Sequence, residues 1–97
     1  MLSLISKLNK AFDHRIRLGI MSVLVVNDHA DFKTLKELLD VTDGNLASHS
    51  KALEKEEFIR VEKSFIGRKP NTKYIATDSG KRAFEEHIAA LEKLIGG

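Results

Sequence analysis

The feature that most constrains this chain is a pair of short amphipathic segments with almost no chain between them. Asp31 is a plausible N-cap for the first segment, a helix that we expect to stop around Asp40. Its apolar residues are Phe32, Leu35, Leu38 and Leu39. After the connection VTD, the side-chain acceptor of Thr42 begins a second helix, roughly Asp43 to Glu57. The residues that share one face of this second helix are Leu46, Ser50 and Leu53. Two short helices joined by a tight turn predict a helix-turn-helix over about residues 32–57.

A β-hairpin is predicted directly after this motif, over about residues 58–77. In FIRVEKSF and TKYIAT the side chains alternate with a period of two, which is typical of strands. The segment IGRKPN between them holds the only proline of the chain beside Gly67 and Asn71, and it predicts the turn. The stretch KSFIGRKPNTK has no acid, although the net charge of the whole chain is only +2. Its four cations are Lys63, Arg68, Lys69 and Lys73.

Further helices are predicted on both sides of these elements. Apolar residues recur at helical spacing near the N-terminus, at Met1, Ile5, Leu8 and Phe12. A second helix from about Asp13 to Val26 is apolar nearly all round, so it is expected to be buried on both sides. A very short strand follows near His29 and Ala30. Asp78 and Ser79 are expected to cap a last helix over about residues 79–95. The apolar stripe of that helix is Phe84, Ile88, Leu91 and Ile95.

Composition limits the kinds of protein that this chain can be. With 97 residues and 42% hydrophobic residues, we expect one domain spanning residues 1–97 with one modest core, mainly α with a small β part. The absence of cysteine excludes disulfides, thiolate metal sites and thiol redox switches. The start of the chain lacks the pattern of a signal peptide, and the apolar run from Ile20 to Val26 is far shorter than the roughly 20 residues of a membrane span. We therefore expect a soluble, cytoplasmic protein.

No catalytic or metal-binding pattern is found in the sequence. GxGxxG, P-loop, GxSxG and HExxH motifs are all missing, so an enzyme is the poorest hypothesis and no cofactor is predicted. His14, His29 and His87 are isolated in the sequence and lack partners at metal-ligand spacing. His49 lies about 60° from the core stripe of its helix. We interpret it as a boundary residue that packs or hydrogen-bonds within the motif.

The outward face of the second helix of the motif is small and polar. At about 100° per residue, this face presents Gly44, Asn45, Ser48, Lys51, Ala52 and Lys55. Such a face suits entry into a DNA groove. The Asn45 amide is able to bond an adenine edge, Ser48 a base or phosphate, and Lys51 and Lys55 phosphates. The alternative is a solvated helix face, which the three acids near the helix end favour. The basic hairpin suits phosphates or a minor groove, and its alternative is a turn kept soluble by charge.

The predicted terminal helices leave apolar faces that a symmetric dimer is able to bury. The residues predicted at this interface are Leu4, Ile5, Leu8, Phe84, Ile88, Leu91, Leu94 and Ile95. The alternative is that these helices cover only their own monomer.

From about residue 12 to residue 90 the sequence resembles the winged-helix regulators of prokaryotes, closest to the small stand-alone proteins related to the MarR and ArsR groups. In those proteins TDGNLxxHLxxLExxGxI precedes a wing with GRxPxTxYxLTxxGRxAF. The residues that match the first pattern are Thr42, Asp43, Gly44, Asn45, Leu46, His49, Leu53 and Glu54. Those that match the second are Gly67, Arg68, Pro70, Thr72, Tyr74, Thr77, Gly80, Ala83 and Phe84.

The resemblance implies a winged helix-turn-helix with terminal dimerisation helices, which places a recognition helix in each major groove and the wing at the flanking backbone or minor groove. The recognition-helix residues assigned to DNA are Thr42, Asp43, Gly44, Asn45, Ser48, His49, Lys51 and Lys55. The wing residues assigned to DNA are Lys63, Arg68, Lys69, Asn71 and Lys73. Three residues depart from the family pattern. Ser50 replaces an apolar residue and loosens a core contact, Glu57 replaces a glycine and predicts a turn without positive φ, and Lys81 interrupts the GR pair.

These observations predict a homodimeric regulator of transcription, most simply a repressor, that binds double-stranded DNA. Two recognition helices related by a twofold axis address half-sites roughly 34 Å apart, so the operator is expected to be an inverted repeat. One alternative is a protein-interaction adaptor, which predicts no salt-sensitive DNA binding. Another is a sensor with a ligand or metal pocket at the dimer interface, with His87, Glu85 or Glu86 as contacts.

Overall fold

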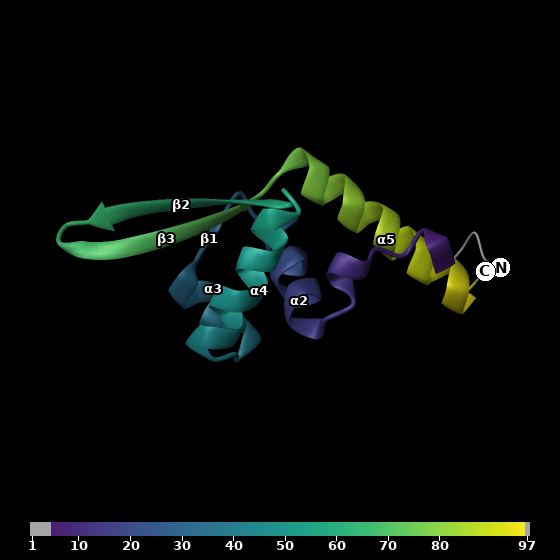
Figure 1. Ribbon diagram of the computed structural model, residues 1–97, viewed down its shortest axis with the longest axis horizontal. Helices are drawn as coiled ribbons and strands as arrows, with labels where there is room; N and C mark the ends of the chain where they lie inside the picture. Colours follow the sequence, from purple (N-terminus) through teal and green to yellow (C-terminus); the bar gives the residue numbers. More distant parts are fainter. Residues whose placement is uncertain (1–4, 97) are drawn as a thin grey trace.

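The computed structural model describes residues 5–96 and confirms the predicted α+β class. The elements follow the order η1 (Lys10–Phe12), α2 (Arg15–Leu24), β1 (Ala30–Asp31), α3 (Phe32–Leu39), α4 (Asp43–Lys55), β2 (Ile59–Ile66), β3 (Lys69–Ala76) and α5 (Asp78–Gly96). Figure 1 shows an elongated molecule in which β2 and β3 project to one side of the helices and α5 projects to the other. Its principal extents are 53 × 24 × 21 Å.

The helix-turn-helix is confirmed, together with both of the caps predicted for it. The carboxylate of Asp31 accepts a hydrogen bond from the Thr34 amide at 2.8 Å, and the hydroxyl of Thr42 accepts one from the Asn45 amide at 3.1 Å. Helix α3 ends at Leu39, next to the predicted Asp40, which is its C-cap and takes φ +51. Because each of these signals lies within one turn of the helix end, the sequence alone locates these boundaries.

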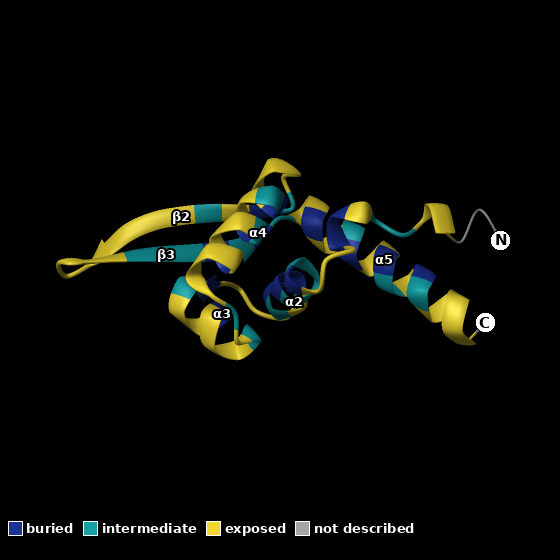
Figure 2. Cartoon of the chain, turned by 60° about the horizontal axis from the view of Figure 1, so that its bottom comes forward, coloured by how far each residue is buried: buried dark blue, intermediate teal, exposed yellow. Residues whose placement is uncertain are grey.

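The hydrophobic core lies where α2, α3 and α4 meet under the base of the sheet. Its fully buried large side chains are Ile20, Met21, Leu24, Leu35, Leu46 and Leu53. A second group of aromatic rings connects η1 to α5, because Phe12 lies 5.4 Å from Phe58 and 5.5 Å from Phe84 between ring centroids. Figure 2 shows that burial concentrates in these helices and at the near end of the sheet, whereas the far half of the hairpin is exposed.

The sheet has the strand order β1-β3-β2 and is antiparallel throughout. Strands β2 and β3 pair over eight residues each, from Ile59 opposite Ala76 to Ile66 opposite Lys69. The expected six-residue turn IGRKPN is therefore wrong, because only Gly67 and Arg68 lie between the strands. Gly67 takes φ +64, as the first central residue of a II′ hairpin turn requires. Pro70 lies within β3 but beyond its pairing with β1, where the strand has a free edge that tolerates a missing amide hydrogen.

The continuous N-terminal helix that the spacing predicts is wrong over the described residues. Met1 and Leu4 lie outside them. From Ile5 onward there is only a short helical stretch, and then the 3-10 helix η1. Asn9 interrupts the helix because its side chain accepts from the Ala11 amide at 2.9 Å and caps η1. The backbone amide of Asn9 donates to Nδ1 of His87 at 2.9 Å, which attaches this segment to α5.

The turn after α4 also differs from the prediction, since Glu57 takes φ +63. The amide of Glu57 donates to the carbonyl of Glu54 at 2.9 Å, and the amide of Phe58 donates to that of Leu53 at 3.0 Å. This pair of bonds forms a Schellman motif, which requires a left-handed residue at the position of Glu57. The expectation of a turn without positive φ is therefore wrong, and a glutamate occupies a backbone conformation that suits glycine.

The last helix is capped by Thr77, and not by Asp78 or Ser79 as predicted. The Thr77 hydroxyl accepts from the Gly80 amide at 2.9 Å and donates to the carbonyl of Glu57 at 2.7 Å. Gly80 is buried here, and a Cβ at this position would lie 2.0 Å from the carbonyl oxygen of Phe58. The end of α4 and the start of α5 are thus held together through one threonine and one glycine.

Ser50 is buried in the core, where its hydroxyl donates to the carbonyl of Leu46 in the preceding turn. Together with Tyr74 of β3 it lines the groove between α4 and the wing. Burial raises the pKa of Tyr74, and the Ser50 side chain opposes that rise. A serine at this position therefore exchanges an apolar contact for a polar group between α4 and the sheet.

Candidate nucleic-acid interface

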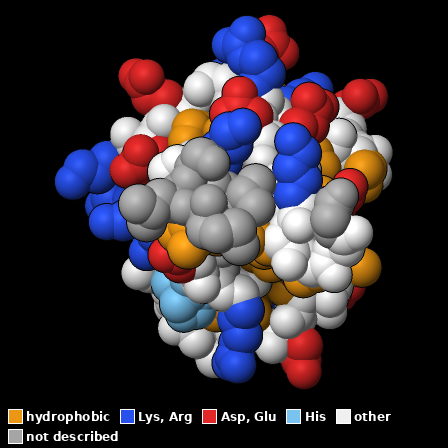
Figure 3. Space-filling view, turned by 90° about the vertical axis from the view of Figure 1, so that its right-hand side faces the viewer, with side chains coloured by type: hydrophobic (Ala, Val, Ile, Leu, Met, Phe, Trp, Pro, Cys, Tyr) orange, Lys and Arg blue, Asp and Glu red, His pale blue; other side chains and the backbone are white. Residues whose placement is uncertain are grey.

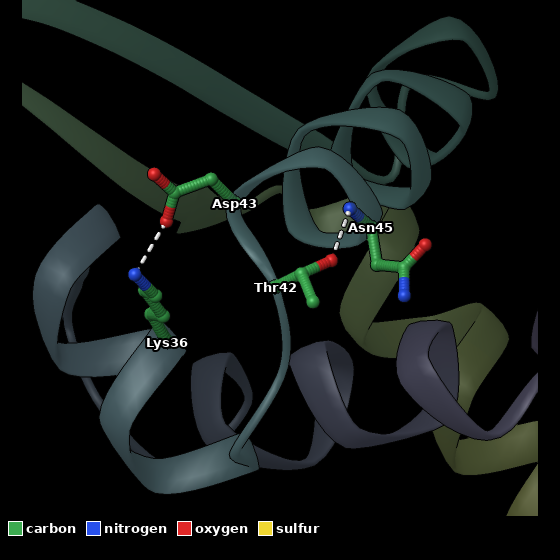
Figure 4. A network of polar contacts seen from close by, with 4 residues as sticks. All are labelled: Lys36, Thr42, Asp43 and Asn45. Carbon is green, nitrogen blue, oxygen red and sulfur yellow. Dashed lines mark hydrogen bonds and ion pairs between the residues drawn. The ribbon is translucent and has the colours of Figure 1, made fainter.

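The start of α4 is fixed by two side-chain contacts, both drawn in Figure 4. One is the Thr42 cap at Asn45, and the other is an ion pair of 2.7 Å between Lys36 Nζ and a carboxylate oxygen of Asp43. The ion pair joins α3 to the first turn of α4 across the tight turn. Thr42 caps α4 and Asp43 pairs with Lys36, so both residues stabilise the helix-turn-helix itself. Their contact with DNA stays a prediction.

The outward face of α4 is open, as its sequence predicts. Gly44, Asn45, Ser48, Lys51 and Lys55 are all exposed, and Ala52 is half-buried. A Cβ at Gly44 would have no atom within 4 Å, so packing does not explain the glycine there. Figure 4 shows the carboxamide of Asn45 turned away from the Lys36–Asp43 pair. The face is therefore free of large apolar side chains, and its polar groups are available to a ligand.

The wing predicted from the sequence carries its cations on different sides. Residues opposite one another in an antiparallel pair share a face, so Lys63 lies on the face of Val61, Tyr74 and Thr72. These four residues line a groove of about 310 Å³ together with Ser50, Lys51 and Glu54 of α4.

Lys73 and Asn71 lie on the other face of the wing, where they line a groove of about 400 Å³ that includes His29 and Asp31. Arg68 and Lys69 are exposed at the turn between the strands. The structure thus places Lys63 beside α4 and Arg68 and Lys69 at the tip, whereas it directs Lys73 away from α4.

Two large apolar side chains that the sequence reasoning did not assign also lie at the tip of the wing. Phe65 is 72% exposed and Ile66 is 67% exposed. Their position in the alternating strand pattern is visible in the sequence. Their exposure is not, because it depends on how far the hairpin extends past α4.

His49 has partners that the sequence did not reveal. Its ring stacks on that of His14 with centroids 3.9 Å apart, and its Nδ1 accepts a hydrogen bond from Nε of Arg17 at 3.1 Å. Burial lowers the pKa of His49, and electrostatic interaction with the neighbouring His14 and Arg17 lowers it further. His49 is half-buried and packs and hydrogen-bonds as expected, but its partners belong to α2, so the prediction that its partners lie within the helix-turn-helix is wrong. His14, which has no histidine or acidic partner at metal-ligand spacing in the sequence, is therefore in contact with another histidine in the fold.

The residues predicted at a dimer interface differ in how far they are exposed, and their role in a dimer stays a prediction. Phe84 packs against Phe12 of its own chain, and Ile88, Leu91 and Leu8 are half-buried. Ile5 and Ile95 are exposed, at 59% and 85% respectively, and Leu94 is 38% exposed. Figure 3 shows this end of the molecule, where hydrophobic side chains lie among basic and acidic ones.

His87, predicted as a contact in the alternative sensor function, belongs to the packing of the chain. It is buried, its Nδ1 accepts from the Asn9 amide, and its ring lies 5.2 Å from that of Phe12. Burial lowers the pKa of His87, and the charge of Asp13 opposes that effect. Within residues 5–96, no group of three His, Asp or Glu side chains is arranged to hold a metal ion. In the same range, no helix is both long and apolar enough to cross a membrane.

Known proteins are similar to this chain in sequence and in fold. The family model described as "Winged helix DNA-binding domain" matches residues 16–95. An uncharacterized protein of Methanocaldococcus jannaschii is 35% identical over 85 residues, which are 88% of this chain and 92% of that protein.

Solved structures agree with this match. A transcriptional regulator homologue from Pyrococcus horikoshii OT3 has a TM-score of 0.89 at 30% identity, covering 98% of this chain and 95% of the other. A MarR family transcriptional regulator from Streptomyces coelicolor, solved in complex with DNA, has a TM-score of 0.70 at 17% identity. That likeness covers 97% of this chain and 65% of the other, and at this identity it concerns the fold alone.

Proposed function

Because the chain belongs to the winged helix DNA-binding domain family of transcriptional regulators, we propose that it is a homodimeric repressor that binds an inverted repeat in double-stranded DNA. The observation that carries the proposal is the open face of α4 beside the basic wing. No large apolar side chain of α4 blocks entry into a major groove, and Asn45 and Ser48 present hydrogen-bonding groups on the outward face.

We assign the wing to the flanking phosphates or the minor groove. Arg68 and Lys69 lie at the exposed turn, at the far end of a hairpin of eight residue pairs. Each phosphate that a cation neutralises releases counterions, so affinity falls as salt rises. Lys63 lines the groove between the wing and α4, and we assign it to the same phosphate backbone.

We assign the dimer to the end of the molecule where α5 projects beyond the core. The exposed Ile95 and Leu94 leave apolar surface on this helix, and the exposed Ile5 adds to it from the N-terminal segment. A twofold axis through this end leaves both α4 helices free. It would present them to half-sites roughly 34 Å apart on one side of a duplex.

Selection of bound duplexes from a randomised library at about 150 mM salt, followed by sequencing, tests the proposal. Enrichment of an inverted repeat with half-sites about 10 base pairs apart supports a dimeric regulator that reads sequence. If the folded protein enriches no sequence and shows no salt-sensitive binding to any duplex, the proposal fails and an adaptor function takes its place.

Two variants separate the roles assigned within the interface. Asn45→Ala is expected to relax sequence preference, while the double variant Arg68→Ala with Lys69→Ala is expected to weaken binding to all duplexes and reduce the salt slope by about two. Equal losses in both, with unchanged specificity and slope, contradict this division of roles.

A further inference from the structure

The cluster of His14, Arg17 and His49 lies where the start of α2 meets the middle of α4, and the proposed function does not use it. The two imidazole rings stack at 3.9 Å with an interplanar angle of 27°. The Nδ1 atom of His14 accepts from the backbone amide of Ile16 at 3.2 Å, and the Nδ1 atom of His49 accepts from Nε of Arg17 at 3.1 Å. One nitrogen of each ring is therefore already occupied within the protein.

These two hydrogen bonds determine where the ring protons lie. A nitrogen that accepts a hydrogen bond must keep its lone pair, so the neutral form of each ring carries its proton on Nε2. Both histidines then present an Nε2–H donor and no free ring acceptor. The interactions that lower the pKa of His49 favour this neutral form.

Arg17 adds positive charge to the same place. It uses Nε for His49, which leaves the terminal nitrogens of its guanidinium group for another partner. Among residues 5–96 the ion pairs join Lys36 to Asp43 and Arg60 to Glu62, so Arg17 has no carboxylate partner there. The cluster is thus rich in donors and carries a positive charge, which is the chemistry that binds a phosphate.

The cluster lies on the flank of α4 that faces away from the wing. His49 follows Asn45 by four residues and is its neighbour along the helix surface. The opposite flank of α4, with Ala47, Lys51 and Glu54, lines the groove shared with the wing. A helix seated in a major groove about 12 Å wide has a phosphate backbone on each side, so one flank of α4 meets one backbone and the other flank meets the second.

We propose that His14, Arg17 and His49 form a binding site for one phosphate of the DNA backbone, on the strand opposite to the one that the wing contacts. This inference rests on the proposed function, because it needs α4 in the major groove. It adds His14 and Arg17, both outside the helix-turn-helix, to the surface that positions the protein on the duplex, and it gives His49 a phosphate as its partner there.

Asparagine substitutions separate binding of a phosphate from support of the fold. The Oδ1 atom of asparagine accepts a hydrogen bond at the position of the histidine Nδ1, and asparagine is a favourable N-cap. His14→Asn therefore keeps the cap at Ile16, and His49→Asn keeps an acceptor for Arg17, while both lose the Nε2–H donor. His49→Gln is the matched control, since its amide nitrogen reaches the position of Nε2.

The experiment measures binding to the selected duplex and to a series of duplexes that each carry one neutral methylphosphonate in the backbone. We expect each asparagine variant to bind the normal duplex about three- to tenfold more weakly, with His49→Gln closer to wild type. One methylphosphonate position, on the strand away from the wing, is expected to weaken the wild type and to have little further effect on either asparagine variant.

The other outcomes are distinct. If wild type binds the duplex and both asparagine variants bind equally well, the phosphate site is wrong and the proposed function stands. If the variants bind weakly but retain full sensitivity to every methylphosphonate, and melt at a lower temperature, the cluster only supports the fold and the inference is overturned. If the wild type binds no duplex, the proposed function fails, and this inference fails with it.

Discussion

Replacing Glu57 with glycine is expected to stabilise the protein. Glu57 holds φ +63 because the Schellman bonds at the end of α4 require it. A residue with a Cβ in this region costs about 1–2 kcal/mol, whereas glycine adopts it freely. Glycine also adds about 0.4–1 kcal/mol of chain entropy to the unfolded state, which opposes the gain. The expected net effect is about 0.5–1 kcal/mol in favour of the folded variant.

Thermal unfolding followed by circular dichroism, at fixed protein concentration, measures this effect. For a domain of this size 1 kcal/mol corresponds to about 4–8 °C, so the melting temperature of Glu57→Gly is expected to rise by about 2–8 °C. Protein concentration is held constant because dimerisation would make the melting temperature depend on it.

Glu57→Ala is the control, because it removes the same carboxylate but keeps the Cβ. The carboxylate lies after the C-terminus of α4, where the helix dipole disfavours negative charge, so alanine alone stabilises by a few tenths of a kcal/mol. The difference between the glycine and alanine variants isolates the backbone effect. If Glu57→Gly melts at or below the temperature of Glu57→Ala, the argument from positive φ is refuted.

Three further changes test other contacts. Gly80→Ala would place a Cβ 2.0 Å from the carbonyl oxygen of Phe58, so we expect the free energy of unfolding in urea to fall by at least about 3 kcal/mol. An unchanged urea midpoint would contradict this packing. Thr42→Ala is expected to cost about 1 kcal/mol of stability while Thr42→Ser retains most of it, and equal losses would show that the cap contributes little. The melting temperature is expected to fall from pH 7.5 to pH 5.5, because burial lowers the pKa of His87 and of His49 and the native state then binds fewer protons than the unfolded state. The stability that the neutral histidines contribute is complete above the unfolded pKa of about 6.5 and is lost as the pH falls. His87→Gln should therefore make the melting temperature depend less on pH. An unchanged dependence would exclude His87 as a cause of it.

The parts of the fold that the sequence predicts correctly depend on signals within a few residues. Asp31 and Thr42 cap their helices through amides three residues further on. The apolar spacing of α4 identifies its buried face, and Leu46 and Leu53 are both fully buried. Because the outward face is the complement of that stripe, the main surface proposed for DNA could also be derived from the sequence.

The parts that the sequence misses depend on contacts between distant residues. The helical spacing of Ile5, Leu8 and Phe12 predicts a helix, but the bond from Asn9 to His87 joins residues 78 positions apart and fixes a different backbone. The bond from Arg17 to His49 spans 32 positions in the same way. No local pattern contains these pairings, so the phosphate site proposed here emerges only from the structure.

Helix α4 is fixed by contacts at its start, its middle and its end, and a surface that reads bases requires such a fixed position. Its start is fixed by the Thr42 cap and by the ion pair to Lys36. Its middle is fixed by the core and by the bond between His49 and Arg17. Its end is fixed by the Schellman bonds and by the Thr77 hydroxyl at the carbonyl of Glu57.

The far half of the wing has no comparable support. It is exposed, and between Lys73 and the tip of the wing the strand β3 pairs only with β2. Base readout requires donors and acceptors held at fixed positions, whereas a contact between a cation and a phosphate tolerates displacement because it depends mainly on charge. The positive φ at Glu57 is therefore understandable as part of the support for α4, since it places Phe58 where its amide closes the helix and its ring joins that of Phe12.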